Sequence, residues 1–282
     1  MGQVKAIIAA LIGAALTGCV PLSREPIGNR YVALGSSYAA GTAIGGIKPG
    51  SPERCGRSPQ NYAALLARRM NLTLDDQSCG GATTAHLLGP WNELPAQLDA
   101  VDARARLVTV TIGGNDLNYV MNLAAASCRP AEGLVYQGKH LPCPQLQPPG
   151  PADFVRLESN LRAIAGTVHR RAPHARLVFV QYVRLVPDQP CAALHLSPEG
   201  ALATRTIGDQ LAAVTRRVAL ETGALVLSSD ELSRDHTACS AQPWSVGPAP
   251  VGPDGNAPWH PNAAGHAALA DALYRLLRGA AA

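Results

Sequence analysis

The stretch YVALGSSYAAG, residues 31–41, has the pattern of a buried strand followed by a tight turn. Its apolar run from Tyr31 to Leu34 stops at Gly35, and two serines, further small residues and a second glycine follow. Open α/β sheets bind ligands beyond the carboxyl ends of their strands, so this position suits a functional serine. The same pattern also fits an ordinary turn in which serine caps a helix. Later segments of the chain distinguish between a functional serine and an ordinary capping turn.

Four more strands are predicted from short apolar and β-branched runs. They span residues 72–77, 106–112, 176–182 and 224–227. Helical patterns separate the strands, including residues 58–70 with Ser58 as N-cap, 152–171, 198–222 and a last helix opened by Pro261 and Asn262. Strands that alternate with helices predict an α/β fold, a three-layer α/β/α sandwich with a five-stranded parallel sheet.

The composition suits one globular domain, because 47% of the 282 residues are hydrophobic and 16% are charged. A net charge of +4 is mild, and the arginines that supply it are scattered, so nucleic-acid binding has no support. No two cysteines have CxxC spacing, which argues against a zinc site. We expect a monomer that needs no metal or other cofactor.

Residues 1–18 have the pattern of a lipoprotein signal peptide, with Lys5 before an apolar stretch (6–16) that is too short to span a bilayer. The letters LTGC at residues 16–19 resemble a bacterial lipobox, in which Cys19 is lipidated and becomes the first residue. Residues 19–29 would then form a tether. The alternatives are an ordinary cleaved signal peptide and an uncleaved anchor. We expect an exported protein of the cell envelope, attached to the membrane only through Cys19, or a secreted one.

The remaining six of the seven cysteines predict three disulfides in an exported chain. Sequence alone leaves their pairing open. They are Cys55, Cys79, Cys128, Cys143, Cys191 and Cys239.

Polar or small residues follow three of the predicted strands. Ser37 follows the first, Gly81 lies in the turn SCGGATT, and Asn115 lies in the turn GGND. The carboxyl ends of parallel strands share one edge of a sheet, so these residues can converge. A histidine is needed to accept a serine proton, and His260, in WHPNAAGH directly before the last helix, is the best placed. Four other histidines are interpreted as surface groups and one as structural: His86, His169, His174, His236 and His266.

Together these segments resemble the SGNH hydrolases, the GDSL family of esterases and lipases. The pattern is most similar to the secreted three-disulfide lipases and esterases of the actinobacterial type, and it covers residues 30–279. The resemblance implies a flavodoxin-like SGNH hydrolase fold and a metal-independent serine hydrolase that acts on a small-molecule or lipid ester. It implies Ser37 as the nucleophile and His260 as the base. The oxyanion hole would comprise the N–H groups of Ser37 and Gly81 and the side-chain amide of Asn115.

The resemblance also implies sequential disulfides. These pairs are Cys55–Cys79, Cys128–Cys143 and Cys191–Cys239.

Two positions depart from the family pattern. Ser36 stands where the family has an aspartate before the nucleophile, and Ala257 stands where it has the acid three residues before the histidine. We expect a backbone carbonyl, that of Ala257, to orient the His260 ring, with Asp254 as the competing acid. These departures keep two alternatives open: a surface-anchored binding protein that has lost activity, and an acyltransferase that uses the same residues.

Overall fold

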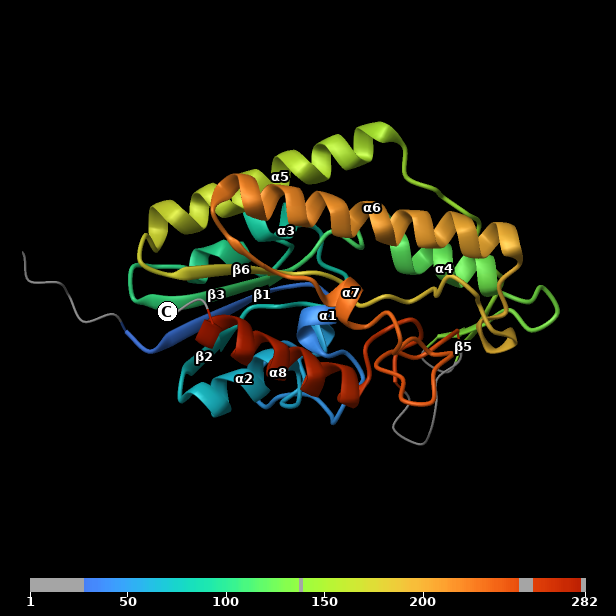
Figure 1. Cartoon of the computed structure of the whole chain (residues 1–282), viewed down its shortest axis with the longest axis horizontal. Coiled ribbons are helices and arrows are strands. Elements are labelled where there is room, and N and C mark those ends of the chain that lie inside the picture. The colour runs from blue at the N-terminus through green and yellow to red at the C-terminus, as the bar shows by residue number, and fades with distance from the viewer. Residues whose placement is uncertain (1–27, 137–138, 249–255, 280–282) are drawn as a thin grey trace, which may run out of the picture.

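The structure, a computed structural model, describes residues 28–136, 139–248 and 256–279. A five-stranded sheet with the order β2-β1-β3-β6-β7 forms its middle layer, and all neighbouring strands are parallel (Figure 1). The strands are β1 (Arg30–Gly35), β2 (Thr73–Asp76), β3 (Ala105–Thr111), β6 (Arg176–Val180) and β7 (Leu225–Leu227). This is the flavodoxin-like strand order. The predicted three-layer α/β/α sandwich with a five-stranded parallel sheet is confirmed.

Helices cover both faces of the sheet. In Figure 1, α3, α4, α5 and α6 lie above it, and α1, α2 and α8 lie below it. Within these layers α5 packs against α6, α4 against α6, and α2 against α8. Their bounds are α1 (Ser37–Ala40), α2 (Tyr62–Met70), α3 (Thr84–Leu88), α4 (Tyr119–Ser127), α5 (Pro151–Arg171), α6 (Pro198–Thr222) and α8 (Ala263–Gly279). The short α7 (Ser229–Leu232) and three 3₁₀ turns, Glu53–Cys55, Gln97–Ala100 and Ala192–Leu194, lie in the connections.

The central strands are apolar on both faces because helices cover both faces. Tyr31 to Leu34 of β1 have no exposed surface, and Val108 and Val110 of β3 are at most 1% exposed. Tyr31 keeps its polar end in this core through a 2.8 Å hydrogen bond to the hydroxyl of Thr109 on β3. The sheet is therefore rigid where its strands end and the polar turns begin.

Two sequence predictions need correction. The helix expected from Ser58 begins at Tyr62, because the Asn61 side chain accepts the N–H of Ala64 and caps it. The Ser58 hydroxyl accepts the N–H of Gln60 in the turn before the helix. Residues 127–151, where none of the five predicted strands lies, contain a short antiparallel hairpin of β4 (Leu134–Tyr136) and β5 (Lys139–Leu141). Strands of this length carry too little periodicity to be read from sequence.

The predicted signal peptide, the lipobox with Cys19 and the tether as far as residue 27 lie outside the described residues. Among the helices that are described, none combines the length and the apolar character needed to cross a membrane.

Candidate active site

The turn between β1 and α1 presents Ser37 at the carboxyl edge of the sheet. Ser37 is the first residue of α1, and Gly35 is the last residue of β1. Gly35 has φ +145°, and a Cβ on it would collide with the carbonyl of Thr111 on β3. The N–H of Ser36 donates to that same carbonyl at 3.0 Å. Glycine therefore lets the turn close against β3, which places Ser37 just beyond the strand.

Ser36 has a partner that is distant in sequence. Its buried hydroxyl lies 2.8 Å from the hydroxyl of Tyr182, and the Tyr182 oxygen accepts the N–H of Gly114 at 3.1 Å. Burial raises the pKa of Tyr182, so its phenol stays neutral. Ser36 and Tyr182 thus link the Ser37 turn to the turn that carries Asn115.

His260 lies against Ser37. Its Nε2 is 2.8 Å from the Ser37 Oγ, and its Nδ1 is 2.7 Å from the carbonyl oxygen of Pro258. The expectation that Ala257 supplies this carbonyl is wrong, because the Ala257 oxygen accepts the backbone N–H of His260 at 3.2 Å. In this tight turn the imidazole Nδ1 reaches the carbonyl of Pro258, two residues before His260. The carbonyl of Ala257, three residues before His260, accepts the backbone N–H and closes the turn. Asp254, the competing acid, lies outside the described residues.

The loop before His260 is fixed by neighbours from two other segments. Trp259 is 1% exposed and has φ +59°, and its backbone N–H donates to the Gly247 carbonyl at 3.0 Å. The Tyr38 hydroxyl donates to the Trp259 carbonyl, and the Tyr38 ring packs on the imidazole with centroids 4.8 Å apart. A left-handed residue costs free energy, which these contacts offset. Tyr38, the residue directly after Ser37, therefore helps to hold the His260 ring in position.

The surroundings of His260 favour its neutral form. Burial lowers its pKa, and the hydrogen bond to Pro258 opposes part of that effect. With Nδ1 donating to Pro258, Nε2 is left as an acceptor that faces the Ser37 hydroxyl. This arrangement can take the proton of Ser37 as its oxygen attacks an electrophile.

Unused hydrogen-bond donors lie in the same turns. The N–H groups of Ser37 and Gly81 have no acceptor among the hydrogen bonds of the described residues. Gly81 has φ +82°, and the Asn115 amide donates to the carbonyl of the next residue, Ala82, at 2.9 Å. A primary amide has two N–H bonds, so Asn115 keeps a second one that has no acceptor among the described residues.

A model of the GDSL-like lipase/acylhydrolase family matches residues 33–268. The chain belongs to this family. Lipase 2 of Streptomyces coelicolor is 35% identical over 259 residues, which are 86% of this chain and 83% of that protein. The crystal structures of an extracellular lipase from Streptomyces rimosus and of phospholipase A1 from Streptomyces albidoflavus each superpose with a TM-score of 0.68 at 26% identity. Each superposition covers 87% of this chain and 98% of the other.

These comparisons confirm the resemblance to the GDSL family that the four motifs indicated. Membership supports the predicted enzyme class, an ester hydrolase. The three disulfides, Cys55–Cys79, Cys128–Cys143 and Cys191–Cys239, have the pairing that the resemblance implies. Among the residues that the structure describes, no three His, Cys, Asp or Glu side chains come together in a way that could hold a metal ion.

In this member of the GDSL family, Asp116 caps a helix that precedes it in the chain. The Asp116 carboxylate accepts the N–H of Thr84, the first residue of α3, at 3.0 Å, and it also binds the Thr84 hydroxyl. The following helix, α4, begins at Tyr119 after Asn118 in the left-handed region. Asp116 therefore ties the Asn115 turn to the segment after Gly81.

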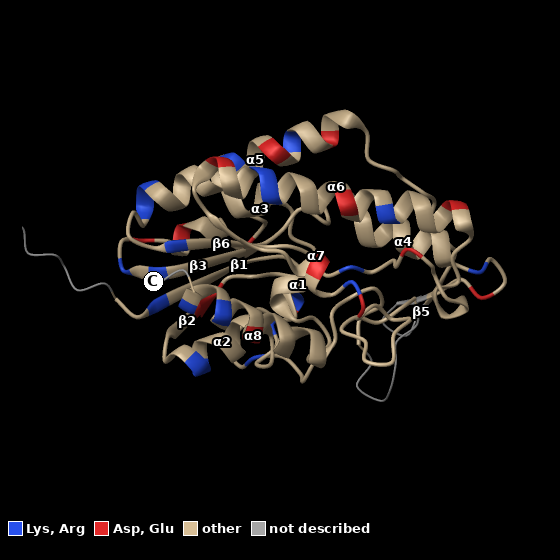
Figure 2. Cartoon of the chain, viewed as in Figure 1, with Lys and Arg blue, Asp and Glu red and all other residues tan. Residues whose placement is uncertain are grey.

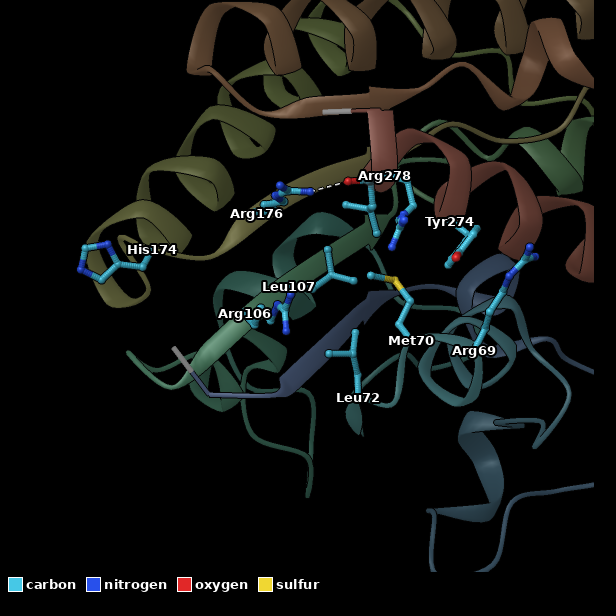
Figure 3. Close-up of a pocket in the computed structure, with 10 residues that line it drawn as sticks. Arg69, Met70, Leu72, Arg106, Leu107, His174, Arg176, Tyr274 and Arg278 are labelled. Atoms are coloured by element: carbon cyan, nitrogen blue, oxygen red, sulfur yellow. Dashed lines mark hydrogen bonds between the residues drawn. The ribbon is translucent and has the colours of Figure 1, made fainter. Parts of the chain in front are cut away.

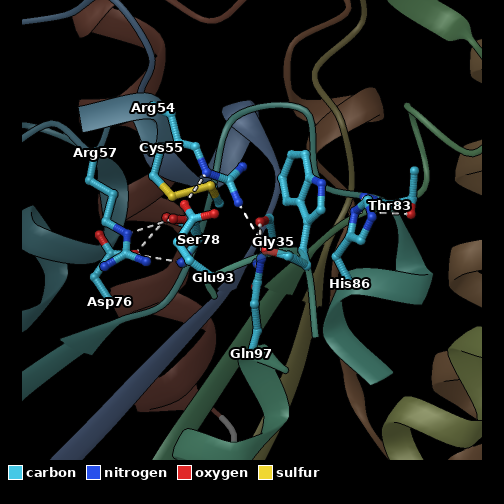
Figure 4. The surroundings of a disulfide bond; sticks show 12 residues. Gly35, Arg54, Cys55, Arg57, Asp76, Ser78, Thr83, His86, Glu93 and Gln97 are labelled. Atoms are coloured by element: carbon cyan, nitrogen blue, oxygen red, sulfur yellow. Dashed lines mark hydrogen bonds and ion pairs between the residues drawn. A yellow bond between two sulfur atoms is a disulfide. The ribbon is translucent and has the colours of Figure 1, made fainter. Parts of the chain in front are cut away.

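A stack of three planar side chains borders Gly81. The His86 ring lies parallel to the Trp91 ring with centroids 4.1 Å apart, and the Arg54 guanidinium lies 4.2 Å over the Trp91 ring. A Cβ on Gly81 would be 3.4 Å from the Trp91 ring. In Figure 4, Arg54 lies beside Cys55, which is bonded to Cys79, and His86 lies farther from that disulfide. His86 is thus half-buried in this stack, where the sequence suggested a free surface group.

Two other aromatic residues, Tyr119 and Trp259, lie in the core and are 2% and 1% exposed. Trp91, in contrast, is only partly buried and borders Gly81. Sequence reasoning did not identify Tyr38, Tyr182 or Arg54. Two sequence signals could have pointed to the tyrosines. Tyr38 directly follows Ser37, and Tyr182 lies at the carboxyl end of the predicted strand 176–182.

Proposed function

We propose that this chain hydrolyses carboxylic esters through an acyl-enzyme on Ser37. The observation that carries the proposal is the 2.8 Å contact between the Ser37 Oγ and the Nε2 of a half-buried His260. A hydroxyl that shares its proton with a neutral imidazole is an activated nucleophile. A family of ester hydrolases and an extracellular lipase among the structural relatives both support this assignment.

The first half-reaction acylates the serine. His260 accepts the Ser37 proton while the serine oxygen bonds to the ester carbonyl carbon, and the carbonyl oxygen becomes an oxyanion. The Ser37 and Gly81 N–H groups and the Asn115 amide donate to that oxyanion. The carbonyl oxygen of Pro258 accepts from Nδ1 and stabilises the imidazolium. The tetrahedral intermediate then breaks its bond to the alkoxide, which leaves with the proton from Nε2.

The second half-reaction releases the acid. His260 takes a proton from water, the water oxygen attacks the acyl carbon, and Ser37 leaves with the proton that His260 returns. In this Ser–His dyad a backbone dipole has the place of the triad carboxylate. A lipid ester is the favoured substrate, because similar proteins are named lipase and phospholipase A1. The enzyme would act as a monomer at the cell envelope, with Cys19 as its lipid anchor.

The first test is labelling of the purified chain by a fluorophosphonate probe, which reacts with activated serines. Labelling should disappear in Ser37→Ala and His260→Ala. It should persist in Ser159→Ala and His169→Ala, matched substitutions at exposed positions on α5. No labelling of the folded, oxidised chain would overturn the proposal in favour of a binding protein. Release of a transfer product in place of acid, with an alcohol present, would indicate an acyltransferase.

Two further variants test the finer roles. Asn115→Ala should lower kcat by roughly 10²- to 10³-fold, the usual effect of losing one oxyanion-hole donor. Asp254→Asn should keep activity near that of the unmodified chain, because the Pro258 carbonyl already accepts from Nδ1. A loss in Asp254→Asn as severe as that in His260→Ala would make Asp254 the third member of a triad.

A further inference from the structure

A basic pocket lies at the end of the sheet opposite to Ser37, where the strands begin (Figure 3). It has a volume of about 670 Å³. Four arginines and one histidine are among its lining residues, and no aspartate or glutamate is: Arg69, Arg106, Arg176, Arg278 and His174. Figure 2 also shows basic segments at this end, on the strands and on the flanking helices. A pocket lined by one sign of charge concentrates ions of the other sign.

The arginines of the basic pocket are incompletely neutralised. The side chains of Arg106 and Arg278 are exposed and have no hydrogen bond or ion pair among the described residues. Arg176 donates to the Leu277 carbonyl at 2.6 Å, a contact with no opposing full charge. Arg69 alone has a carboxylate, that of Asp271, and its guanidinium also lies over the Tyr274 ring. The pocket therefore offers several guanidinium donors to an anion with several oxygens.

The floor of the pocket is apolar. Met70, Leu72, Leu107 and Leu277 line it beneath the arginines. Figure 3 shows Met70, Leu72 and Leu107 pointing toward the same space from neighbouring elements. A ligand that fits this lining carries an anionic group beside an apolar part, which is the chemistry of a phospholipid at its headgroup.

The basic pocket also adjoins the place where the N-terminal segment enters the domain. Arg30 at the start of β1 is in register with Ala105, the residue before Arg106, and Leu107 is in register with Arg176. A Cβ on Gly28, the first described residue, would meet the carbonyl of Arg104 at 2.6 Å. The predicted lipid attachment at Cys19 is eleven residues before Arg30, a reach of about 40 Å at full extension. This end of the domain would therefore face the membrane.

We propose that the basic pocket binds the phosphate headgroup of an anionic phospholipid in the membrane to which residues 19–29 lead. Two contacts, the lipidated Cys19 and the basic pocket, would then hold the domain in one orientation. Ser37, at the other end of the strands, would point away from that membrane, so its lipid ester substrate would not come from the bilayer that anchors the protein.

The test measures binding of the whole chain carrying Cys19→Ser to vesicles of ether-linked phosphatidylcholine, with or without ether-linked phosphatidylglycerol. Ether lipids have no carboxylic ester, so hydrolysis does not interfere. The readout is the ratio of affinities for anionic and neutral vesicles, which cancels any contribution from the apolar stretch at residues 6–16. Each arginine near an anionic surface is worth about a 5-fold change in affinity, so Arg106→Gln with Arg278→Gln should lower the ratio roughly 25-fold.

The matched control is Arg216→Gln with Arg275→Gln, exposed arginines outside the pocket that remove the same charge. It should change the ratio far less, and both double variants should unfold at the temperature of the unmodified chain. An equal loss in the two double variants would mean general charge attraction and would overturn the proposal. A ratio of anionic to neutral vesicle affinity near one, for the chain that carries only Cys19→Ser, would also overturn the proposal. Full displacement of vesicles by glycerol phosphate at similar concentration would make a free phosphate ester the ligand instead.

Discussion

The hydroxyl groups of Ser36 and Tyr182 lie 2.8 Å apart in the buried space between two turns at the carboxyl edge of the sheet. The Tyr182 oxygen also accepts the N–H of Gly114, the residue before Asn115. One phenol thus joins the turn that presents Ser37 to the turn that presents Asn115. A serine in the place of the family aspartate is accommodated because this phenol reaches it.

We expect Tyr182→Phe to lower the free energy of unfolding by about 1–3 kcal/mol, because it leaves the Ser36 hydroxyl and the Gly114 N–H without this partner in a buried place. It should also lower kcat/KM for p-nitrophenyl acetate, since the two turns lose their link. Urea denaturation and ester hydrolysis measure the two effects. Tyr119→Phe is the control, because Tyr119 is also a buried residue and its hydroxyl has no hydrogen bond among the described residues. Equal losses in both variants would contradict the role assigned to Tyr182.

The acid limb of the kcat/KM profile should have its midpoint below 6.5, the ordinary pKa of histidine. Burial lowers the pKa of His260, and the Pro258 carbonyl only partly opposes this. Catalysis needs the neutral imidazole, and a lowered pKa keeps it neutral to a lower pH. Activity is therefore complete above this pKa and is lost as the pH falls through it. A midpoint at or above 6.5, with the protein still folded, would rule out this account.

Stability should also depend on pH through His266. Its ring is fully buried beside Tyr62, and its Nδ1 accepts the Tyr62 N–H at 3.1 Å. Burial, with a smaller contribution from His260, lowers the pKa of His266 to about 3. Between pH 6.5 and about 3 the unfolded chain binds a proton that the folded chain does not. Stability is thus full above pH 6.5 and falls by up to about 1.4 kcal/mol per pH unit below it.

His266→Gln can keep an acceptor for the Tyr62 N–H but cannot be protonated. Urea denaturation at a series of pH values should give a shallower slope below pH 6.5 for this variant than for the unmodified chain. His169→Gln, at an exposed position on α5, should keep the original slope. If His266→Gln also keeps it, another group is responsible for the acid sensitivity.

The disulfides should differ in their effect on activity. Cys55–Cys79 joins the loop after the Ser37 turn to the turn with Gly81, and the Cys55 carbonyl also accepts the Gly80 N–H at 2.9 Å. Replacing both cysteines by alanine should lower the free energy of unfolding by about 2–4 kcal/mol and reduce kcat/KM. Replacing Cys128 and Cys143 removes a link within one loop, so it should cost stability with little change in kcat/KM for a small ester. An equal loss of kcat/KM in the two double-cysteine variants would contradict this difference between the disulfides.

The sequence by itself was sufficient for the fold class. Apolar strands that end at Gly35 and Gly113, and helices between them, are local patterns that persist whatever surrounds them. The four motifs around Ser37, Gly81, Asn115 and His260 likewise follow from local turn chemistry and their order along the chain. The geometry then brings Ser37 and His260 to hydrogen-bond distance.

Only the tertiary structure decided which groups support these residues. The acceptor for His260 is Pro258 and not Ala257, the partner of Ser36 is 146 residues away, and Asp116 caps α3 and not α4. Each of these is a choice among several nearby polar groups, and hydrogen bonds extend only about 3 Å. Small differences in where the packed segments meet therefore select the partner, and local sequence does not encode those positions.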